Sequence, residues 1–286
     1  RRDERACHAA TFAGRKGQPL LQSYYDLFRL FRKDSVYSST TTWVFRIAPA
    51  VIFLTTLAAT CLVPLLGDST LPSFPGDLVV LFYLLGVARF FLILSALDTG
   101  SAFEGMGASR EAFYSALVEP ITFVCLLSVM RANGAGSLVE ALSTPMSAHS
   151  LSVALAALPL FLVLLAENAR IPIDDPNTHL ELTMIHEVMI LDNSGRGLAL
   201  MEYAAALKLW LFTLVLGRML VPVSGAHPVA EVAALLLLAG LLSIAVGVVE
   251  SVMARVRLVK VPQLLLGAGV VAVLGLFVNI TGALEW

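Results

Sequence analysis

Long apolar runs separated by polar stretches dominate the chain. A run of about 16–23 residues is long enough for a helix to cross the hydrocarbon core of a bilayer. Seven such runs occur, at residues 43–66, 78–97, 112–130, 151–166, 198–220, 230–249 and 261–280. Because lipid offers the backbone no hydrogen-bond partner, each run is predicted to be a transmembrane α-helix. We therefore predict an all-α, polytopic helix bundle at 43–286, preceded by a basic amino-terminal segment at 1–42.

Composition agrees with a membrane protein and limits the chemistry. The mean hydropathy is +0.83, and 58% of the residues are hydrophobic while 14% are charged. The three cysteines (Cys7, Cys61 and Cys125) are far apart and form no CxxC pair, which argues against a zinc site, an iron–sulfur cluster or a disulfide scaffold. The net charge of −2 does not indicate nucleic acid binding. We expect neither a metal nor another cofactor on this chain.

Lysine and arginine are distributed unequally between the two sides of the membrane, which follow from the fact that successive runs cross it in opposite directions. Fourteen of them fall in 1–42 and in the loops 98–111, 167–197 and 250–260, which share one side, whereas the opposite side carries Arg131. Such an excess marks the cytoplasmic side of a membrane protein. We predict a multi-pass protein of the cell membrane, with the segment 1–42 and the loop 167–197 in the cytoplasm.

Several charged residues fall inside the apolar runs or at their cytoplasmic ends. Each charged group in a span costs about 2.5–3.5 kcal/mol on insertion scales and therefore usually marks a cavity or an ion pathway. Glu119 and Lys208 are too deep to snorkel easily, and Arg89, Glu167 and Glu202 lie in the same leaflet. These groups are predicted to line a funnel open to the cytoplasm and to pass protons. The charges nearer the ends of the runs are interpreted as snorkelling or solvated groups, namely Arg46, Arg218, Glu231 and Glu250.

The loop sequence RIPIDDPNTHLELTMIHE concentrates ionisable groups. Glu167 and Arg170 are spaced for an ion pair, and the two prolines of the loop hold Asp174 in an extended stretch. Thr178 and Glu181 have the spacing of a capping box, which predicts a short amphipathic helix that starts there. A helix of some 12 residues is too short to span, so it should lie at the cytoplasmic surface.

Projection of that helix at 100° per residue separates its polar groups. His186 and Glu187 fall on the polar face, as contacts to a docked partner, whereas Glu181 and Asp192 fall in the apolar arc and are predicted to be buried. His179 and His186 have no zinc-ligand spacing, so a metal site is disfavoured. No serine or cysteine is set against the cluster, so nucleophilic catalysis has no support either.

Three stretches in order resemble the membrane subunit 1 family of respiratory complex I. They are AGRKGQPLLQSYYDLFRLFRK, GASREAFYSALVEP and AENARIPIDDPNTHLELTMIHEVMILDNSG. The matching positions are Gly14, Arg15, Gly17, Gln22, Asp26, Arg110, Glu119, Glu167, Arg170, Pro172, Asp174, Glu181, Asp192 and Gly195. The run ELTMIHE is closer to the related subunit of energy-converting NiFe hydrogenases and formate hydrogenlyase-type complexes, such as hydrogenase-4 component C.

Two departures from the family pattern accompany this resemblance. Gln18 replaces a proline, and Asp192 replaces a longer acid. The family has eight spans, of which the first precedes the basic segment. We expect that first helix to be missing from this sequence.

The resemblance implies a non-catalytic subunit that anchors a peripheral redox arm and couples electron transfer to ion movement. It implies a proton path through Glu119, Glu167, Asp174, Glu181, Asp192 and Glu202, to which we add Lys208 for its depth in a span. The implied charge partners are Arg110 and Arg170, to which we add Arg89 for the same reason. The implied contacts to the peripheral arm are Arg15, Arg29, Arg32, Lys33, His186 and Glu187. The loop 167–197 is the counterpart of the wall of a quinone cavity.

The partners implied are hydrogenase large and small subunits and iron–sulfur proteins at the cytoplasmic face, which would carry the cofactors, and antiporter-like subunits in the membrane. Two alternatives stay open. One is the corresponding membrane subunit of a quinone-reducing NADH dehydrogenase (complex I). The other is a stand-alone proton-coupled secondary transporter, although the paired broken helices common in such transporters are not evident in the sequence.

Overall fold

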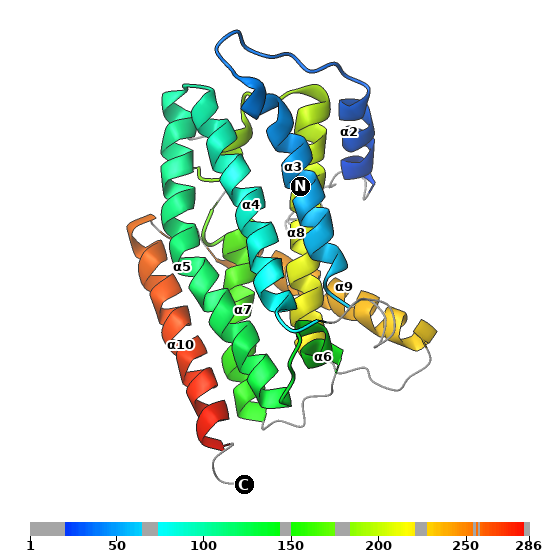
Figure 1. Cartoon of the computed structure of the whole chain (residues 1–286), viewed down its shortest axis with the longest axis vertical. Helices are drawn as coiled ribbons and strands as arrows, with labels where there is room; N and C mark the ends of the chain where they lie inside the picture. The colour runs from blue at the N-terminus through cyan, green and yellow to red at the C-terminus, as the bar shows by residue number, and fades with distance from the viewer. Residues whose placement is uncertain are drawn as a thin grey trace.

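The computed structural model describes residues 21–64, 74–143, 150–174, 184–220, 228–253, 256 and 258–282. Its regular structure is helical throughout these residues, as predicted (Figure 1). The α-helices are α2 (Gln22–Phe31), α3 (Trp43–Cys61), α4 (Asp77–Asp98), α5 (Ala102–Asn133), α6 (Leu138–Ser143), α7 (Ser150–Glu167), α8 (Gly195–Leu220), α9 (Pro228–Val252) and α10 (Val261–Gly282). Two short 3-10 helices, η1 (Glu187–Ile190) and η2 (Leu258–Lys260), complete the described elements.

The predicted apolar runs all coincide with helices. In the described part of the chain, α3, α4, α5, α8, α9 and the continuous helix of η2 and α10 are long and apolar enough to cross a bilayer. The apolar helix α7 has a shorter searched portion and is a plausible seventh span. One boundary differs substantially from the prediction, because α5 begins at Ala102 and not at residue 112.

The helices α3, α4, α5, α7, α8 and α10 run roughly side by side, whereas α9 leans away from the bundle (Figure 1). Helix α3 packs against α4 and α8, and α5 packs against α4, α7 and α10. The turn between α4 and α5 and the start of α8 lie at the upper end in Figure 1, opposite the chain's carboxyl terminus. The short helix α2 packs against α8 near that same end.

Residues 184–190, which precede α8, pack into a second, smaller hydrophobic core. This core joins residues of α3, α4, α5 and α8 to Met184, Val188, Met189 and Ile190. The side chains of Val188 and Met189 are fully buried there. Gly107 of α5 permits this contact, since a Cβ atom at residue 107 would lie 2.2 Å from Cγ1 of Val188. The loop is therefore fixed to the same helix that carries Glu119.

The amphipathic loop helix is shorter than the sequence predicts. Thr178 and Glu181 lie outside the described residues, and Met184 to His186 are not helical. Of the predicted helix, the structure shows one 3-10 turn at Glu187–Ile190. Tertiary packing and not helical periodicity turns most of its apolar side chains inward. Met184, Ile185, Val188, Met189 and Ile190 are buried, whereas Leu191 is exposed.

Candidate functional site

Arg89, halfway along α4, is the centre of a buried group of charged residues. Its side chain is 8% exposed, and its three nitrogen atoms face three different carboxylates. Nη1 donates to Glu119 of α5, Nη2 donates to Glu167 of α7, and Nε lies 3.4 Å from Oε1 of Glu111 of α5. A guanidinium presents its donors in a fixed plane, so Arg89 holds three helices in one arrangement.

Glu167 receives a second cation. Nζ of Lys208, on α8, lies 2.5 Å from Oε2 of Glu167, whose side chain is 6% exposed. Two cations therefore face three carboxylates drawn from four helices. We call Arg89, Glu111, Glu119, Glu167 and Lys208 the charge network. Burial of so many charges is costly unless they are paired, which explains why the network is compact.

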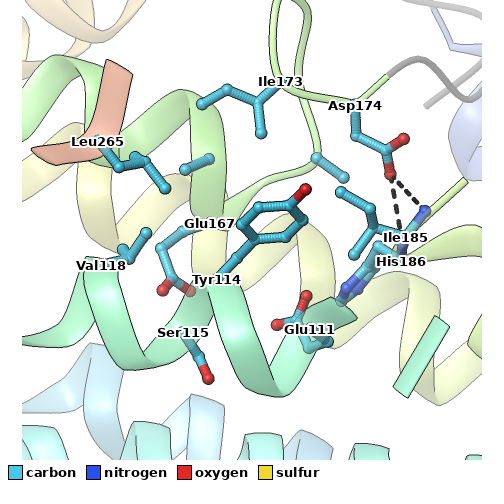
Figure 2. Close-up of a pocket in the computed structure, with 12 residues that line it drawn as sticks. Glu111, Tyr114, Ser115, Val118, Glu167, Ile173, Asp174, Ile185, His186 and Leu265 are labelled. Carbon is cyan, nitrogen blue, oxygen red and sulfur yellow. Dashed lines mark hydrogen bonds between the residues drawn. The ribbon is translucent and has the colours of Figure 1, made fainter. Parts of the chain in front are cut away.

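A cavity of about 20 Å³ adjoins the network on the side of the loop, and we call it the loop-side cavity. Glu111, Glu167, Asp174 and His186 contribute to its lining, as does Tyr114, whose ring lies at the centre of the view in Figure 2. A cavity needs about 10–15 Å³ of such space to hold one water molecule. The loop-side cavity is thus the size of a single water site among acids and a histidine.

A second cavity, of about 40 Å³, lies between α3, α4 and α8, and we call it the α3-side cavity. Most of its lining is aliphatic, but Arg89, Glu111, His186 and Lys208 form a polar part of its wall. Its volume is sufficient for a few water molecules. Glu111 and His186 line both cavities, so these two side chains separate them.

Glu119 reaches the outer surface of the bundle. Its side chain is 46% exposed and lines an open groove of about 650 Å³ between α4 and α5. The remaining lining of this groove is apolar and largely aromatic, including Phe82, Tyr83, Phe90 and Phe123. The charge network therefore extends from the buried end of α7 to an apolar outer face.

Asp174 fixes the loop beside the loop-side cavity. Its side chain is 1% exposed, and Oδ2 accepts hydrogen bonds from the backbone N–H groups of Ile185 (3.2 Å) and His186 (3.3 Å), drawn as dashed lines in Figure 2. Arg110 supports the same segment, because its Nη1 donates to the carbonyl oxygen of Met184 at 3.1 Å. Asp174 and Arg110 thus both hold the backbone of the loop between Met184 and His186 in place.

Arg170 does not pair with Glu167 as the spacing had predicted. Its Nη1 lies 3.3 Å from Oε1 of Glu250, on α9. Glu167 is turned into the bundle by Arg89 and Lys208, which leaves Arg170 to join the loop to α9. Glu250 is 9% exposed and is not the solvated group we predicted. Glu231, at the other end of α9, is also buried, at 6%.

The structure does not bring every predicted acid to the network. Asp192 is exposed to solvent, so its predicted burial is wrong; the helix that would have turned it inward ends at Ile190. Glu202 is half-buried on α8 and is not part of the charge network that the described residues form. Glu181 and Arg15 lie outside the described residues.

Two acids of α5 were not identified from the sequence. Glu111 belongs to the charge network, and Glu104, 1% exposed, accepts hydrogen bonds from the Thr99 hydroxyl and from the backbone N–H of Asp192. Both fall in the polar stretch that we had assigned to a loop before the span. An available signal was the spacing of Glu111 and Glu119, which are little more than two helical turns apart.

Helix α2 lies at the upper end of Figure 1. Among the predicted contacts to a peripheral arm, Arg29 of α2 and the following Arg32 and Lys33 are exposed, whereas His186 and Glu187 are half-buried. Across the described residues, no three His, Cys, Asp or Glu side chains are grouped so that they could hold a metal ion. The two described cysteines, Cys61 and Cys125, are free thiols.

The fold and this site define a polytopic helical membrane protein with ionisable groups paired between its spans. The chain belongs to the family described as NADH dehydrogenase, that of complex I subunit 1, whose signature matches residues 4–280. It is 34% identical to formate hydrogenlyase subunit 4 of Escherichia coli over 268 residues, which are 89% of this chain and 85% of that one. Hydrogenase-4 component C of Escherichia coli is 34% identical over 202 residues, 70% of this chain and 63% of that one.

More distant relatives have the same fold or family. A subunit of the NADH-quinone oxidoreductase of Rubrobacter xylanophilus is 28% identical over 168 residues, 57% of this chain and 51% of that one. A chain of the membrane-bound sulfane sulfur reductase, an archaeal respiratory membrane complex, superposes with a TM-score of 0.82 at 19% identity. That match covers 96% of this chain and 92% of the other. The protein is thus a membrane subunit of a respiratory-type complex related to hydrogenases and complex I.

Proposed function

We propose that this chain is the ion-translocation-coupling and anchoring subunit of a membrane-bound, proton-pumping NiFe hydrogenase complex. The observation that carries the proposal is the charge network of Arg89, Glu111, Glu119, Glu167 and Lys208, which joins the loop-side cavity to the outer groove. Networks of ionisable groups inside a membrane mark ion paths. The identity to formate hydrogenlyase subunit 4 and to hydrogenase-4 component C favours the hydrogenase branch.

The proposed path starts at the loop. Asp174 and His186 receive protons at the loop-side cavity, which Glu167 also lines and where Lys208 pairs with Glu167 from within the bundle. Glu119 delivers the proton to the groove between α4 and α5. Asp192, Glu202 and Glu181 are secondary candidates on the same proposed side. Antiporter-like membrane subunits would take up the ion beyond Glu119.

The proposed anchoring surface is the cytoplasmic end of the bundle. Hydrogenase large and small subunits and iron–sulfur proteins would dock there and carry the nickel–iron centre and the clusters. The exposed cations Arg29, Arg32 and Lys33, with Arg15, and the half-buried His186 and Glu187 would contact them. Charge complementarity at such a surface chiefly sets orientation and association rate.

The test of the coupling role uses the intact complex in proteoliposomes, with electron transfer and ion gradient measured together. Glu119→Gln preserves the shape of the side chain, and is expected to abolish the gradient while electron transfer continues. Glu140→Gln is the matched control, because Glu140 is an exposed acid at the far end of the bundle whose carboxylate caps the N–H of Gly136. An undiminished gradient in Glu119→Gln would refute the coupling role.

Purification of the complex through a tag on this chain tests the assignment to a hydrogenase. Recovery of a NiFe large subunit with iron–sulfur proteins is the expected result. Recovery of flavin and NADH-oxidising modules would place the chain in a quinone-reducing complex I instead. Isolation of the chain alone would favour a secondary transporter.

A further inference from the structure

The charge network has one more carboxylate than cation. Glu111, Glu119 and Glu167 face Arg89 and Lys208, so the ionised network would carry one excess negative charge. An uncompensated charge is costly in a buried site, and such a group is neutralised by taking up a proton. Protonation of one of the three acids would balance the charges of the network.

The contacts indicate which acid it is. Glu167 faces a different cation with each of its oxygens, Arg89 with Oε1 and Lys208 with Oε2. Glu119 accepts a hydrogen bond from Nη1 of Arg89 and is partly exposed. Glu111 is the acid of the network held least tightly, because its closest approach to a cation is the 3.4 Å between its Oε1 and Nε of Arg89.

The other charged groups around Glu111 support the same choice. Arg89 and Lys208 face it as cations, from α4 and α8, while Glu167 of α7 and Asp174 of the loop face it as anions. His186, also from the loop, lines the same two cavities. The anions oppose a charge on Glu111, and the cations are already engaged by Glu167 and Glu119.

A buried donor is available to an ionised Glu111. Nε of Arg89 has no hydrogen-bond partner among the described residues, and the side chain is buried, at 8% exposure. When Glu111 is ionised, a shift of a few tenths of an ångström would complete this hydrogen bond, which is of the strong, charge-assisted kind. When Glu111 is protonated, Nε is left with the loose contact that the structure shows. Protonated and ionised Glu111 would thus be arranged differently around one partner, Arg89.

We propose that Glu111 carries the exchangeable proton of the charge network and passes it between the loop-side cavity and the α3-side cavity. Its carboxyl group borders both cavities, and each is large enough for water. Uptake forms an O–H bond at Glu111 with a proton from hydronium or from the imidazolium of His186 on the loop side, and leaves water or neutral imidazole. Release breaks that bond and returns the proton to water in the α3-side cavity, with no transfer of electrons. The role of this step in transport rests on the proposed coupling function, but its test does not.

The experiment is infrared difference spectroscopy of the purified, membrane-reconstituted complex titrated across pH, compared between the native chain and variants. Glu111→Gln is expected to remove a C=O stretching band of a protonated carboxylic acid, and Glu111→Asp to retain a shifted band. Glu119→Gln or Glu167→Gln removes one carboxylate, so that two cations face two acids; Glu111 can then ionise, and the band is expected to weaken. Glu104→Gln, which changes the other buried acid of the same helix, is expected to keep the band.

Persistence of the band in Glu111→Gln, its loss in Glu104→Gln, or an undiminished band in both Glu119→Gln and Glu167→Gln would overturn the proposal. Melting of each variant complex is measured alongside, and Glu111→Asp distinguishes lost chemistry from lost folding. The two proposals separate cleanly in the gradient assay. Loss of the band in Glu111→Gln with an undiminished gradient in Glu119→Gln would retain Glu111 as the proton carrier and refute the coupling role.

Discussion

Gly107 lies so close to Val188 that a Cβ atom at residue 107 would be 2.2 Å from Cγ1 of Val188 and 3.0 Å from the carbonyl oxygen of Ile185. This contact presses the loop between α7 and α8 onto α5. A side chain at residue 107 cannot be accommodated by a rotamer change alone, since one of the two neighbours is backbone. The close approach of these two segments sets the position of the loop-side cavity, which is lined by Glu111 of α5 and by His186 of the loop.

Gly107→Ala is predicted to destabilise the protein by about 1–3 kcal/mol, the usual cost of overpacking a buried contact. Gly105→Ala is the matched control, because a Cβ atom at residue 105 of the same helix meets nothing within 4 Å. There, alanine should be neutral or stabilising by up to about 1 kcal/mol. Thermal unfolding of the purified complex measures both. Equal melting of the two variants would contradict the close packing of the loop.

Arg89→Lys is predicted to destabilise the bundle even though the charge is retained. A lysine offers one compact ammonium, whereas Arg89 directs separate nitrogen atoms to Glu111, Glu119 and Glu167. Arg89→Gln, which removes the cation, should cost about 3–5 kcal/mol because it leaves buried charges unpaired. Melting curves in detergent and the yield of assembled complex measure this effect, and stability is expected to fall in the order native protein, Arg89→Lys, Arg89→Gln. A Lys variant as stable as the native protein would show that position of charge, and not the planar fork, is what matters.

The helices could be predicted from the sequence because the bilayer imposes a length of apolar chain on each span. The same rule could not place the start of α5. Residues 102 to 111 include Glu104, Arg110 and Glu111 and do not continue the apolar run, yet they are helical, and α5 packs against α4 and η1. Hydropathy reports transfer into lipid and says nothing of a helix that extends beyond the membrane. Glu104 and Glu111 were missed for this reason.

Charge positions could be predicted, but charge partners could not. The depth of Glu119 and Lys208 in their spans identified them as functional candidates. Which cation each acid contacts depends on how helices far apart in sequence are packed, and local spacing misleads. The Glu167–Arg170 spacing predicted a pair, yet Glu167 contacts Arg89, 78 residues away, and Arg170 contacts Glu250, 80 residues away. Asp192 failed for a related reason, since its predicted burial assumed a helix that tertiary packing replaced with a single turn.

Asp174→Ala is predicted to loosen the loop end, because it leaves the N–H groups of Ile185 and His186 without their acceptor. A buried donor left unpaired costs about 1–3 kcal/mol. Asp174→Asn keeps an acceptor oxygen and should preserve most of the protection. Hydrogen exchange of these two amides is the measurement. Faster exchange in both variants would show that the negative charge, and not the acceptor alone, holds the loop.

The ion pair of Arg170 and Glu250 is predicted to couple the loop to α9. Both side chains are about nine-tenths buried, at 8% and 9% exposure, and the backbone N–H of Val256 also donates to the carbonyl oxygen of Pro172 at 3.0 Å. Removal of one partner leaves an uncompensated buried charge. The losses in free energy of unfolding caused by Arg170→Ala and by Glu250→Ala should therefore add up to more than the loss in the double variant, and each should exceed half of it.

A double-mutant cycle on thermal unfolding measures this coupling, which is expected to be about 0.5–3 kcal/mol for residues in contact. The pair of Arg196 and Asp34 provides the control, since its atoms are 3.9 Å apart and its side chains are 69% and 99% exposed. Exposed pairs of this kind contribute little that can be measured, so their cycle should be additive. Additive behaviour of Arg170 and Glu250 as well would mean that the loop and α9 are held together by the surrounding backbone and apolar contacts instead.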